Sequence, residues 1–274
     1  MKRSITAAAL VSLVACGGGS DGPTGPSPSV SAPTLTTANT SIYIGQTVQF
    51  AATGGGSMRW GGDNFNVATI DQSTGRVTGV GNGRVTIWAE NEGGRTTRLL
   101  RGLPSFAGSW QGNWIVEGCT ANGVFAILDT CAEFPNGESA SLGLSLTQSD
   151  DRIAAGGMVF GGATGSTTAA TVGEDGQVRM TASLNPLPDN PIRINIENIV
   201  LHSPSAGSIQ GSLEQVWGST GFSGTMRIYA RVANLTRTSG GPTLLAPPPA
   251  GRTLEDLIRL LGPVRLRGLA GQRP

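Results

Sequence analysis

The sequence predicts an all-β protein, in which a small β-sandwich precedes an antiparallel up-and-down β-barrel of about eight strands and a short C-terminal helix. Three observations predict this fold class. Glycine accounts for 42 of the 274 residues, whereas charged residues make up only 14%. Apolar and polar residues alternate with a period of two along many short segments, which is typical of strands with one buried face. Turns rich in Gly, Asn and Asp separate these segments at short intervals, as in sandwiches and barrels.

Residues 1–15 have the pattern of an export signal. Two basic residues, Lys2 and Arg3, precede an apolar stretch that is too short to cross a bilayer as a helix. The stretch ends in Leu13-Val14-Ala15-Cys16, which resembles the lipobox of bacterial lipoproteins. That resemblance implies a signal peptide over residues 1–15 and a Cys16 thiol that carries acyl chains such as palmitate, which anchor the protein to a membrane. The alternative is an ordinary secretory signal with an incidental cysteine.

Residues 16–33 are predicted to form a disordered tether, because they are mostly Gly, Ser, Pro and Thr and hold too few apolar side chains for a core. The residue after the cysteine is Gly17 rather than Asp, so nothing in the resemblance implies retention at the inner membrane. We therefore expect an outer-membrane lipoprotein that faces the periplasm or the cell surface.

Short alternating segments with Gly-rich turns between them mark a first folded domain over residues 34–101. Several of its segments resemble a group 2 bacterial immunoglobulin-like domain: Ile44-Gly45-Gln46-Thr47-Val48-Gln49-Phe50, Trp60, Val67-Ala68-Thr69-Ile70-Asp71, Gly75-Arg76-Val77-Thr78-Gly79-Val80-Gly81-Asn82-Gly83 and Val85-Thr86-Ile87. The resemblance implies a β-sandwich that acts as a spacer or an adhesion module and has no catalytic residues. Trp60 is expected in the sandwich core and Trp88 on a sheet face, with a ligand platform as the alternative for both.

The second folded domain, residues 104–237, alternates from Phe106 to about Leu235, which predicts a run of antiparallel hairpins. Closure into a barrel would remove the exposed edges of such a run. Alternation does not say which face is inside. Aromatic residues are few and do not recur at strand ends, which favours a barrel with an apolar lumen over an outer-membrane barrel with an apolar outer face.

The start of the second domain, Gly108-Ser109-Trp110, resembles the Gly-x-Trp opening of lipocalin-like barrels. The resemblance implies that the tryptophan packs near an arginine on the last strand, for which Arg227 and Arg231 are the candidates. The candidate ligand-binding residues are therefore Trp110, Trp114, Arg227 and Arg231. The alternative is that Trp110 and Trp114 are core residues of the first strand and need no ligand.

Cys119 and Cys131 are the cysteines that remain besides Cys16. Export would place them in an oxidising compartment, so a disulfide between them is expected, stapling the loop between the first two barrel strands. A redox or metal pair is the alternative, and the CxxC spacing that would support it is absent.

The sequence predicts no enzyme, metal or cofactor. His202 is the only histidine and lies in no recognisable motif, which argues against a serine triad or a histidine zinc site. Two acidic pairs, Asp150-Asp151 and Glu174-Asp175, are expected at solvated hairpin tips, with calcium binding or acid–base pairing as the alternative. Residues 238–274 are expected to be a mostly disordered Pro/Gly linker with a short amphipathic helix around Leu254 to Leu261.

These features together predict a membrane-anchored, non-enzymatic lipoprotein of the cell envelope. The immunoglobulin-like domain would act as a spacer or adhesion module, and the barrel would bind a surface ligand, either protein or carbohydrate. The alternative function is a carrier of a small hydrophobic ligand in the barrel lumen. Nucleic acid is not an expected partner, because the net charge is only +1 and basic residues gather at the two ends of the chain, which leaves a mildly acidic body.

Overall fold

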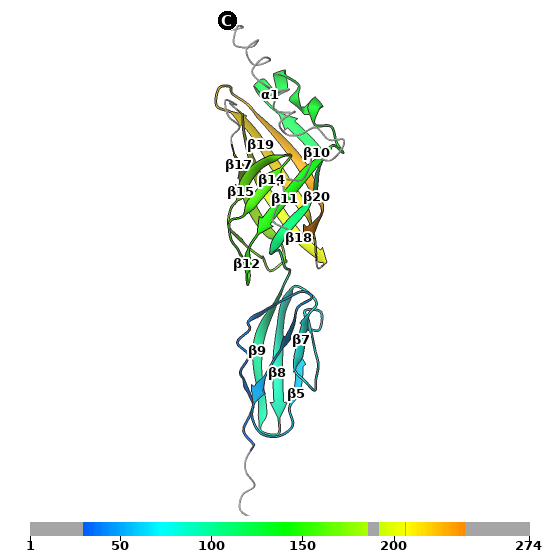
Figure 1. The fold of residues 1–274 in the computed structure, drawn as a ribbon, viewed down its shortest axis with the longest axis vertical. Coiled ribbons are helices and arrows are strands. Elements are labelled where there is room, and N and C mark those ends of the chain that lie inside the picture. Colours follow the sequence, from blue (N-terminus) through cyan, green and yellow to red (C-terminus); the bar gives the residue numbers. More distant parts are fainter. Residues whose placement is uncertain (1–29, 186–191, 206, 239–274) are drawn as a thin grey trace, which may run out of the picture.

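The computed structural model describes residues 30–185, 192–205 and 207–238, which form two β domains arranged end to end (Figure 1). The predicted signal peptide, Cys16, most of the tether and the C-terminal helix lie outside the described residues. The all-β fold class is confirmed, with a sandwich followed by a closed antiparallel barrel. Within the described residues, no helix is long and apolar enough to cross a membrane.

The sandwich is built from nine short strands around one apolar core. A four-stranded sheet has the order β2-β9-β8-β5, a three-stranded sheet has the order β3-β7-β6, and β1 pairs with β4. Strand β2 runs parallel to β9, whereas the other pairs are antiparallel. The strands are β1 (Thr34–Leu35), β2 (Ser41–Tyr43), β3 (Thr47–Gln49), β4 (Ala52–Thr53), β5 (Arg59–Gly62), β6 (Ala68–Ile70), β7 (Arg76–Gly79), β8 (Gly83–Asn91) and β9 (Gly94–Leu103).

The two sandwich tryptophans lie where the sequence predicts them. Trp60 is 4% exposed in the core, and a Cβ on Gly75, whose φ is +73°, would lie 2.5 Å from its ring. Trp88 is half-buried on the outer face of the four-stranded sheet, so close to Gly61 that a Cβ there would meet its ring at 2.1 Å. The guanidinium of Arg95 lies 4.2 Å from the centroid of the Trp88 ring, so a ligand would have to displace Arg95 to stack there.

The second domain is a closed barrel of eight strands in the order β10-β11-β14-β15-β17-β18-β19-β20. Each strand pairs with the next barrel strand along the chain, and β20 closes on β10, so the predicted up-and-down topology is confirmed. The barrel strands are β10 (Gly108–Ala121), β11 (Ser139–Leu146), β14 (Gly157–Phe160), β15 (Ala163–Thr167), β17 (Val178–Leu184), β18 (Ile192–Ser205), β19 (Ser208–Ser219) and β20 (Thr225–Thr238).

The apolar face of every long barrel strand points inward. On β17, for example, buried and exposed residues alternate from Val178 to Leu184 without exception, as strand geometry requires. The interior is filled by large side chains, including Trp110, Trp114 and Trp217, which are at most 2% exposed. Trp114 stacks on Phe160 with ring centroids 4.8 Å apart and an interplanar angle of 8°. Charged residues that form ion pairs lie on the outer wall.

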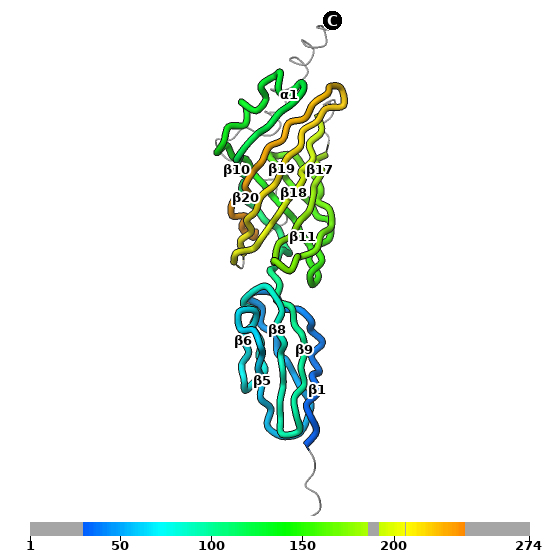
Figure 2. Tube along the Cα trace, turned by 180° about the vertical axis from the view of Figure 1, so that it is seen from behind, coloured from blue at the N-terminus to red at the C-terminus, as the bar shows by residue number. Residues whose placement is uncertain are grey.

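A compact segment between β10 and β11 lies at the end of the barrel that is far from the sandwich (Figures 1 and 2). It contains the short helix α1 (Val124–Ile127) and the 3₁₀ turn η1 (Thr130–Glu133). The ring of Phe134 meets Trp217 edge-on at 5.4 Å. The predicted disulfide between Cys119 and Cys131 is present and ties this cap to β10. The alternation of apolar and polar residues identifies strands only, so it does not predict the helical turns of this segment.

A small three-stranded sheet, β12-β13-β16, stands at the opposite end of the barrel, next to the sandwich. Its strands are β12 (Gln148–Ser149), β13 (Arg152–Ile153) and β16 (Ala170–Thr171). This sheet carries the hairpin that extends β11 and β14 beyond the barrel, and it positions the candidate site described next.

Candidate functional site

The two barrel tryptophans singled out from the sequence are core residues. Trp110 is fully buried, and its indole N–H donates to the carbonyl of Phe106 at 2.7 Å. Trp114 is 2% exposed and stacks on Phe160 inside the barrel. Neither ring reaches the outer surface, so neither can act as a surface platform.

The arginine that stacks over Trp110 is Arg237 rather than Arg227 or Arg231. Its guanidinium lies 4.9 Å from the Trp110 ring centroid, and the two residues face each other directly in the pairing of β10 with β20. The prediction of an arginine on the last strand next to this tryptophan therefore holds, but the choice of residue was wrong.

Arg227 and Arg231 instead form ion pairs on the outer wall of the barrel. Arg227 pairs with Glu214 and lies 3.6 Å from Glu197, and Arg231 pairs with Glu117 at 3.1 Å. Partial burial raises the pKa of the Glu214 carboxyl, but hydrogen bonds from Arg227 and Asn198 outweigh it and hold this pKa below its usual range. These arginines are neutralised locally, which makes them poor anchors for an anionic ligand.

The remaining predicted candidates are scattered. His202 is exposed on β18, and the cysteines of the barrel are joined in the disulfide. Within the described residues, no cluster of three His, Cys, Asp or Glu side chains is placed to hold a metal ion. The acidic pairs are not simple solvated tips, because Asp151 pairs with Arg101 and Glu174 with Arg84, both in the sandwich.

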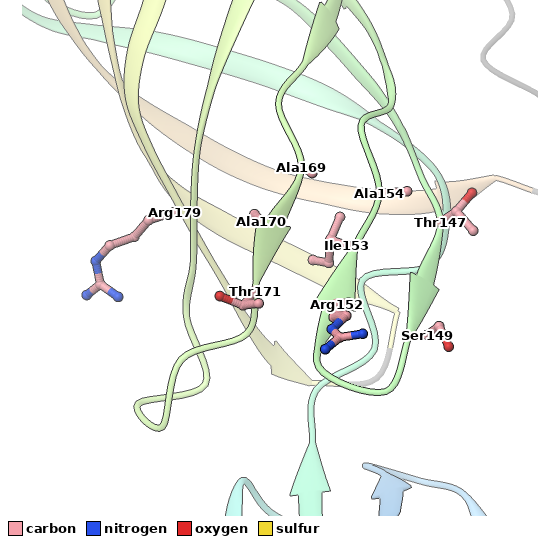
Figure 3. Close-up of a pocket in the computed structure, with 9 residues that line it drawn as sticks. All are labelled: Thr147, Ser149, Arg152, Ile153, Ala154, Ala169, Ala170, Thr171 and Arg179. Carbon is pink, nitrogen blue, oxygen red and sulfur yellow. The ribbon is translucent and has the colours of Figure 1, made fainter.

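A shallow groove of about 730 Å³ lies over the small sheet β12-β13-β16, and we call it the shelf (Figure 3). Strand register explains its shape. Ser149, Arg152 and Thr171 are paired across the three strands, so their side chains share one face of the sheet. The lining residues are Thr147, Ser149, Arg152, Ile153, Ala154, Ala169, Ala170, Thr171 and Arg179.

Apolar side chains line the middle of the shelf and two arginines lie at its edges. The apolar residues are Ile153, Ala154, Ala169 and Ala170, and hydroxyls of Ser and Thr surround them. Arg179 donates to Asp175 at 2.8 Å and to Gln177 at 2.9 Å. Its hydrogen bond to Asp175 is the main cause that lowers the pKa of that carboxyl.

Arg152 differs from Arg179 in having no polar partner within the part of the chain that the structure describes. Among the hydrogen bonds and ion pairs of the described residues, none involves its guanidinium, and the residue is exposed on the shelf. A guanidinium offers a planar set of N–H donors that matches a carboxylate or phosphate. Sequence reasoning missed this arginine, because its neighbours Ala154, Ala169 and Thr171 come together only through the pairing of β13 with β16.

The barrel interior holds two donors without acceptors. The indole N–H of Trp114 and the side-chain N–H₂ of Gln215 are buried and have no hydrogen-bond partner in the described part of the chain. The carbonyl oxygen of the same Gln215 side chain accepts from the Trp217 indole at 3.1 Å. Because an unpaired buried donor costs free energy, an acceptor next to either group would stabilise it.

Comparisons with known proteins inform the sandwich but not the barrel. A search of curated proteins found no match. Human Protocadherin-24 EC1-2, a solved structure, aligns over 77% of this chain and 99% of its own at 10% identity, with a TM-score of 0.26, too low to support a structural argument. Residues 29–97 match the family model of the bacterial Ig-like domain (group 2), and the strands over this range form the sandwich described above. The N-terminal domain is therefore a group 2 bacterial Ig-like domain.

Proposed function

We propose that the protein is a non-enzymatic lipoprotein of the cell envelope whose barrel binds an acidic ligand at the shelf. The Ig-like domain acts as the spacer between the barrel and a membrane anchor at Cys16, in the outer membrane. The observation that carries the binding role is Arg152, whose guanidinium has no partner among the described residues, beside a groove with apolar side chains in its middle. Such a combination of a free cation and an apolar floor is typical of a site that orients a ligand by one charged group.

The ligand class follows from the side chains of the shelf. A carboxylate fits the guanidinium of Arg152, and the hydroxyls of Ser149 and Thr171 supply further hydrogen bonds. The described lining holds no aromatic ring on which a sugar could stack, whereas alanine methyl groups suit short aliphatic side chains. We therefore favour an acidic peptide segment with small apolar residues over a carbohydrate.

A binding assay with two probes tests this site. The fluorescence anisotropy of a labelled peptide of alternating glutamate and alanine is measured against the full chain, in parallel with an oligogalacturonate of similar charge. We expect the peptide to bind, and Arg152→Gln to weaken binding roughly tenfold, the loss of one charge-assisted contact. Arg231→Gln is the matched control, because this exposed arginine lies on the outer wall and already pairs with Glu117.

The proposal for the shelf is wrong if the peptide shows no saturable binding, or if Arg152→Gln and Arg231→Gln behave alike. Binding of the oligogalacturonate alone, abolished by Arg152→Gln, would assign the same shelf to a carbohydrate and overturn the peptide class.

The membrane anchor has a separate test. Cells that express the full chain are labelled with a palmitate analogue, and membranes are separated from soluble protein. We expect the label on the wild-type chain in the outer-membrane fraction, and a Cys16→Ala variant that is unlabelled and released. An unlabelled wild-type chain would refute the anchor without affecting the shelf.

A carrier function is the second candidate, favoured by the unpaired donors of Trp114 and Gln215 inside the barrel. Its ligand would be a small, mostly apolar molecule with a hydrogen-bond acceptor. Native mass spectrometry of the purified chain would then show an added mass that organic extraction removes and that Gln215→Leu reduces. A wild-type mass equal to that of the protein alone would reject the carrier and leave the packed interior as a structural core.

A further inference from the structure

The end of the barrel that faces the Ig-like domain carries two turns that touch it. The first turn joins β12 to β13 and contains Asp150 and Asp151, and the second follows β16 and contains Glu174. Figures 1 and 2 show the two domains meeting at this end, with one short connection between them. These two turns contain the acidic pairs that the sequence predicts to lie at solvated hairpin tips.

Arg101 of β9 joins both turns to the Ig-like domain. Its guanidinium donates to the Asp151 carboxylate at 2.8 Å and to the carbonyls of Val172 and Gly173 at 2.9 and 3.0 Å. The side chain is only 24% exposed, so these contacts are screened less by solvent than those of a surface pair. A single residue of one domain thus holds two separate turns of the other.

Other contacts surround this arginine. Ser41 donates its hydroxyl to Asp150 at 2.5 Å, and the Asn82 amide donates to the carbonyl of Glu174 at 2.6 Å. Arg84 pairs with Glu174 at 2.5 Å, but this pair is largely exposed and contributes little. Burial raises the pKa of the Tyr43 hydroxyl, which lies 3.5 Å from the Asp150 carbonyl.

The connection between the domains is itself part of the barrel core. Leu103, the last residue of β9, and Phe106 are fully buried in the same apolar cluster as the barrel tryptophans. Gln148 fixes the chain between them, accepting from the Phe106 backbone N–H at 2.7 Å and donating to the Pro104 carbonyl at 3.2 Å. A linker with buried anchors and satisfied backbone groups has little freedom to bend.

We propose that the barrel rim is a specific docking surface for the Ig-like domain, so that the two domains form one rigid rod that unfolds as a unit. The contacts of Arg101 and Gln148 and the burial of Leu103 and Phe106 carry this inference. The Ig-like domain then sets both the distance and the orientation of the barrel, which a flexible spacer cannot do. This holds whether or not the shelf binds a ligand.

Amide residual dipolar couplings of the full chain test the rigid rod. We expect couplings from residues 34–103 and 108–185 of the wild type to fit one alignment tensor, and calorimetry to show one unfolding transition. In Arg101→Ala/Gln148→Ala the two sets should need different tensors, and the barrel should melt about 3–8 °C lower. Arg95→Ala is the matched control, because Arg95 pairs with Glu90 within the Ig-like domain and touches neither turn.

Two tensors for the wild type overturn the proposal without any variant. One shared tensor in the double variant, with the melting temperature of the wild type, also overturns it, because the named contacts would then not hold the joint. Unchanged chemical shifts within each domain of the double variant show that both domains remain folded.

Discussion

Removing the disulfide of the barrel should cost a predictable amount of stability. The bridge joins Cys119 and Cys131, which are 12 residues apart in sequence. Closing a loop of this length in the unfolded chain corresponds to roughly 3 kcal/mol at 25 °C. The closed loop contains α1 and the first half of η1, whose few turns have little stability of their own. The bridge should therefore also determine whether the cap stays ordered.

The variant is Cys119→Ser/Cys131→Ser, in which both thiols are replaced so that none is left free to pair elsewhere. Urea unfolding is followed by the near-ultraviolet circular dichroism of the barrel tryptophans, because Trp217 packs against Phe134 of the cap. With the slopes usual for small domains, a loss of about 3 kcal/mol lowers the midpoint by roughly 1–3 M urea.

The wild-type chain treated with a reducing agent is the control, and it should match the double variant. A midpoint that falls by less than about 0.3 M urea, equivalent to less than about 1 kcal/mol, would refute the reasoning. It would show that the unfolded loop is already compact or that cap contacts are absent from the native ensemble.

Three further predictions concern single side chains. Gly75→Ala should lower the free energy of unfolding, measured by calorimetry, by about 2–4 kcal/mol, because the added Cβ would lie 2.5 Å from the Trp60 ring. Gly137→Ala, with φ +91° and nothing within 4 Å, should cost only about 1 kcal/mol. Arg237→Gln should cost about 1 kcal/mol in urea unfolding by removing the cation over Trp110, and Arg231→Gln should not. Hydrogen bonds from Ser73 and Thr74 lower the pKa of Asp71 to about 2. The stabilisation by this carboxylate should therefore be complete above about pH 4 and disappear as the pH falls through about 2. Acid unfolding should show this pH dependence in the wild type and not in Asp71→Ala.

The architecture could be predicted from the sequence, because the alternation of apolar and polar residues is a local property. Buried positions such as Val178, Met180 and Ala182 recur every second residue, and this period identifies both a strand and its inward face. The number of predicted hairpins then favours a closed barrel, even when the pairing of the strands is not known. The disulfide was also predictable, since the expected export of the chain places its two remaining cysteines in an oxidising compartment.

Side-chain partners across strands were not predictable, because they depend on register. Arg227, Arg231 and Arg237 all lie on β20, and alternation treats them alike. The pairing of β10 with β20 shifts register twice, between Gln111 and Asn113 and between Val116 and Gly118. Each bulge changes which residue stands opposite, so the arginine next to Trp110 follows from the pairing rather than from position in the sequence.

Contacts between domains were hidden for a related reason. Asp150 and Asp151 have the composition of an ordinary solvated turn, and their partners Ser41 and Arg101 lie 109 and 50 residues earlier in the chain. No local pattern distinguishes an acidic turn in water from one that accepts an arginine of another domain. The same limit applies to Phe106, whose apolar side chain looks like the start of a strand and is in fact buried in the joint.

The shelf and the joint share one structural cause. Strand β13 pairs with β12 and β16 in a sheet separate from the barrel, which both opens the shelf and carries the Asp150-Asp151 turn to the Ig-like domain. Arg152 lines the shelf and also the smaller cavity that Arg101 and Ser41 line at the joint. Because β13 has only two residues and few contacts of its own, its position depends on the Asp150-Asp151 turn that contacts the Ig-like domain. A variant that frees the joint should therefore also weaken binding at the shelf, whereas Arg152→Gln should leave the joint intact.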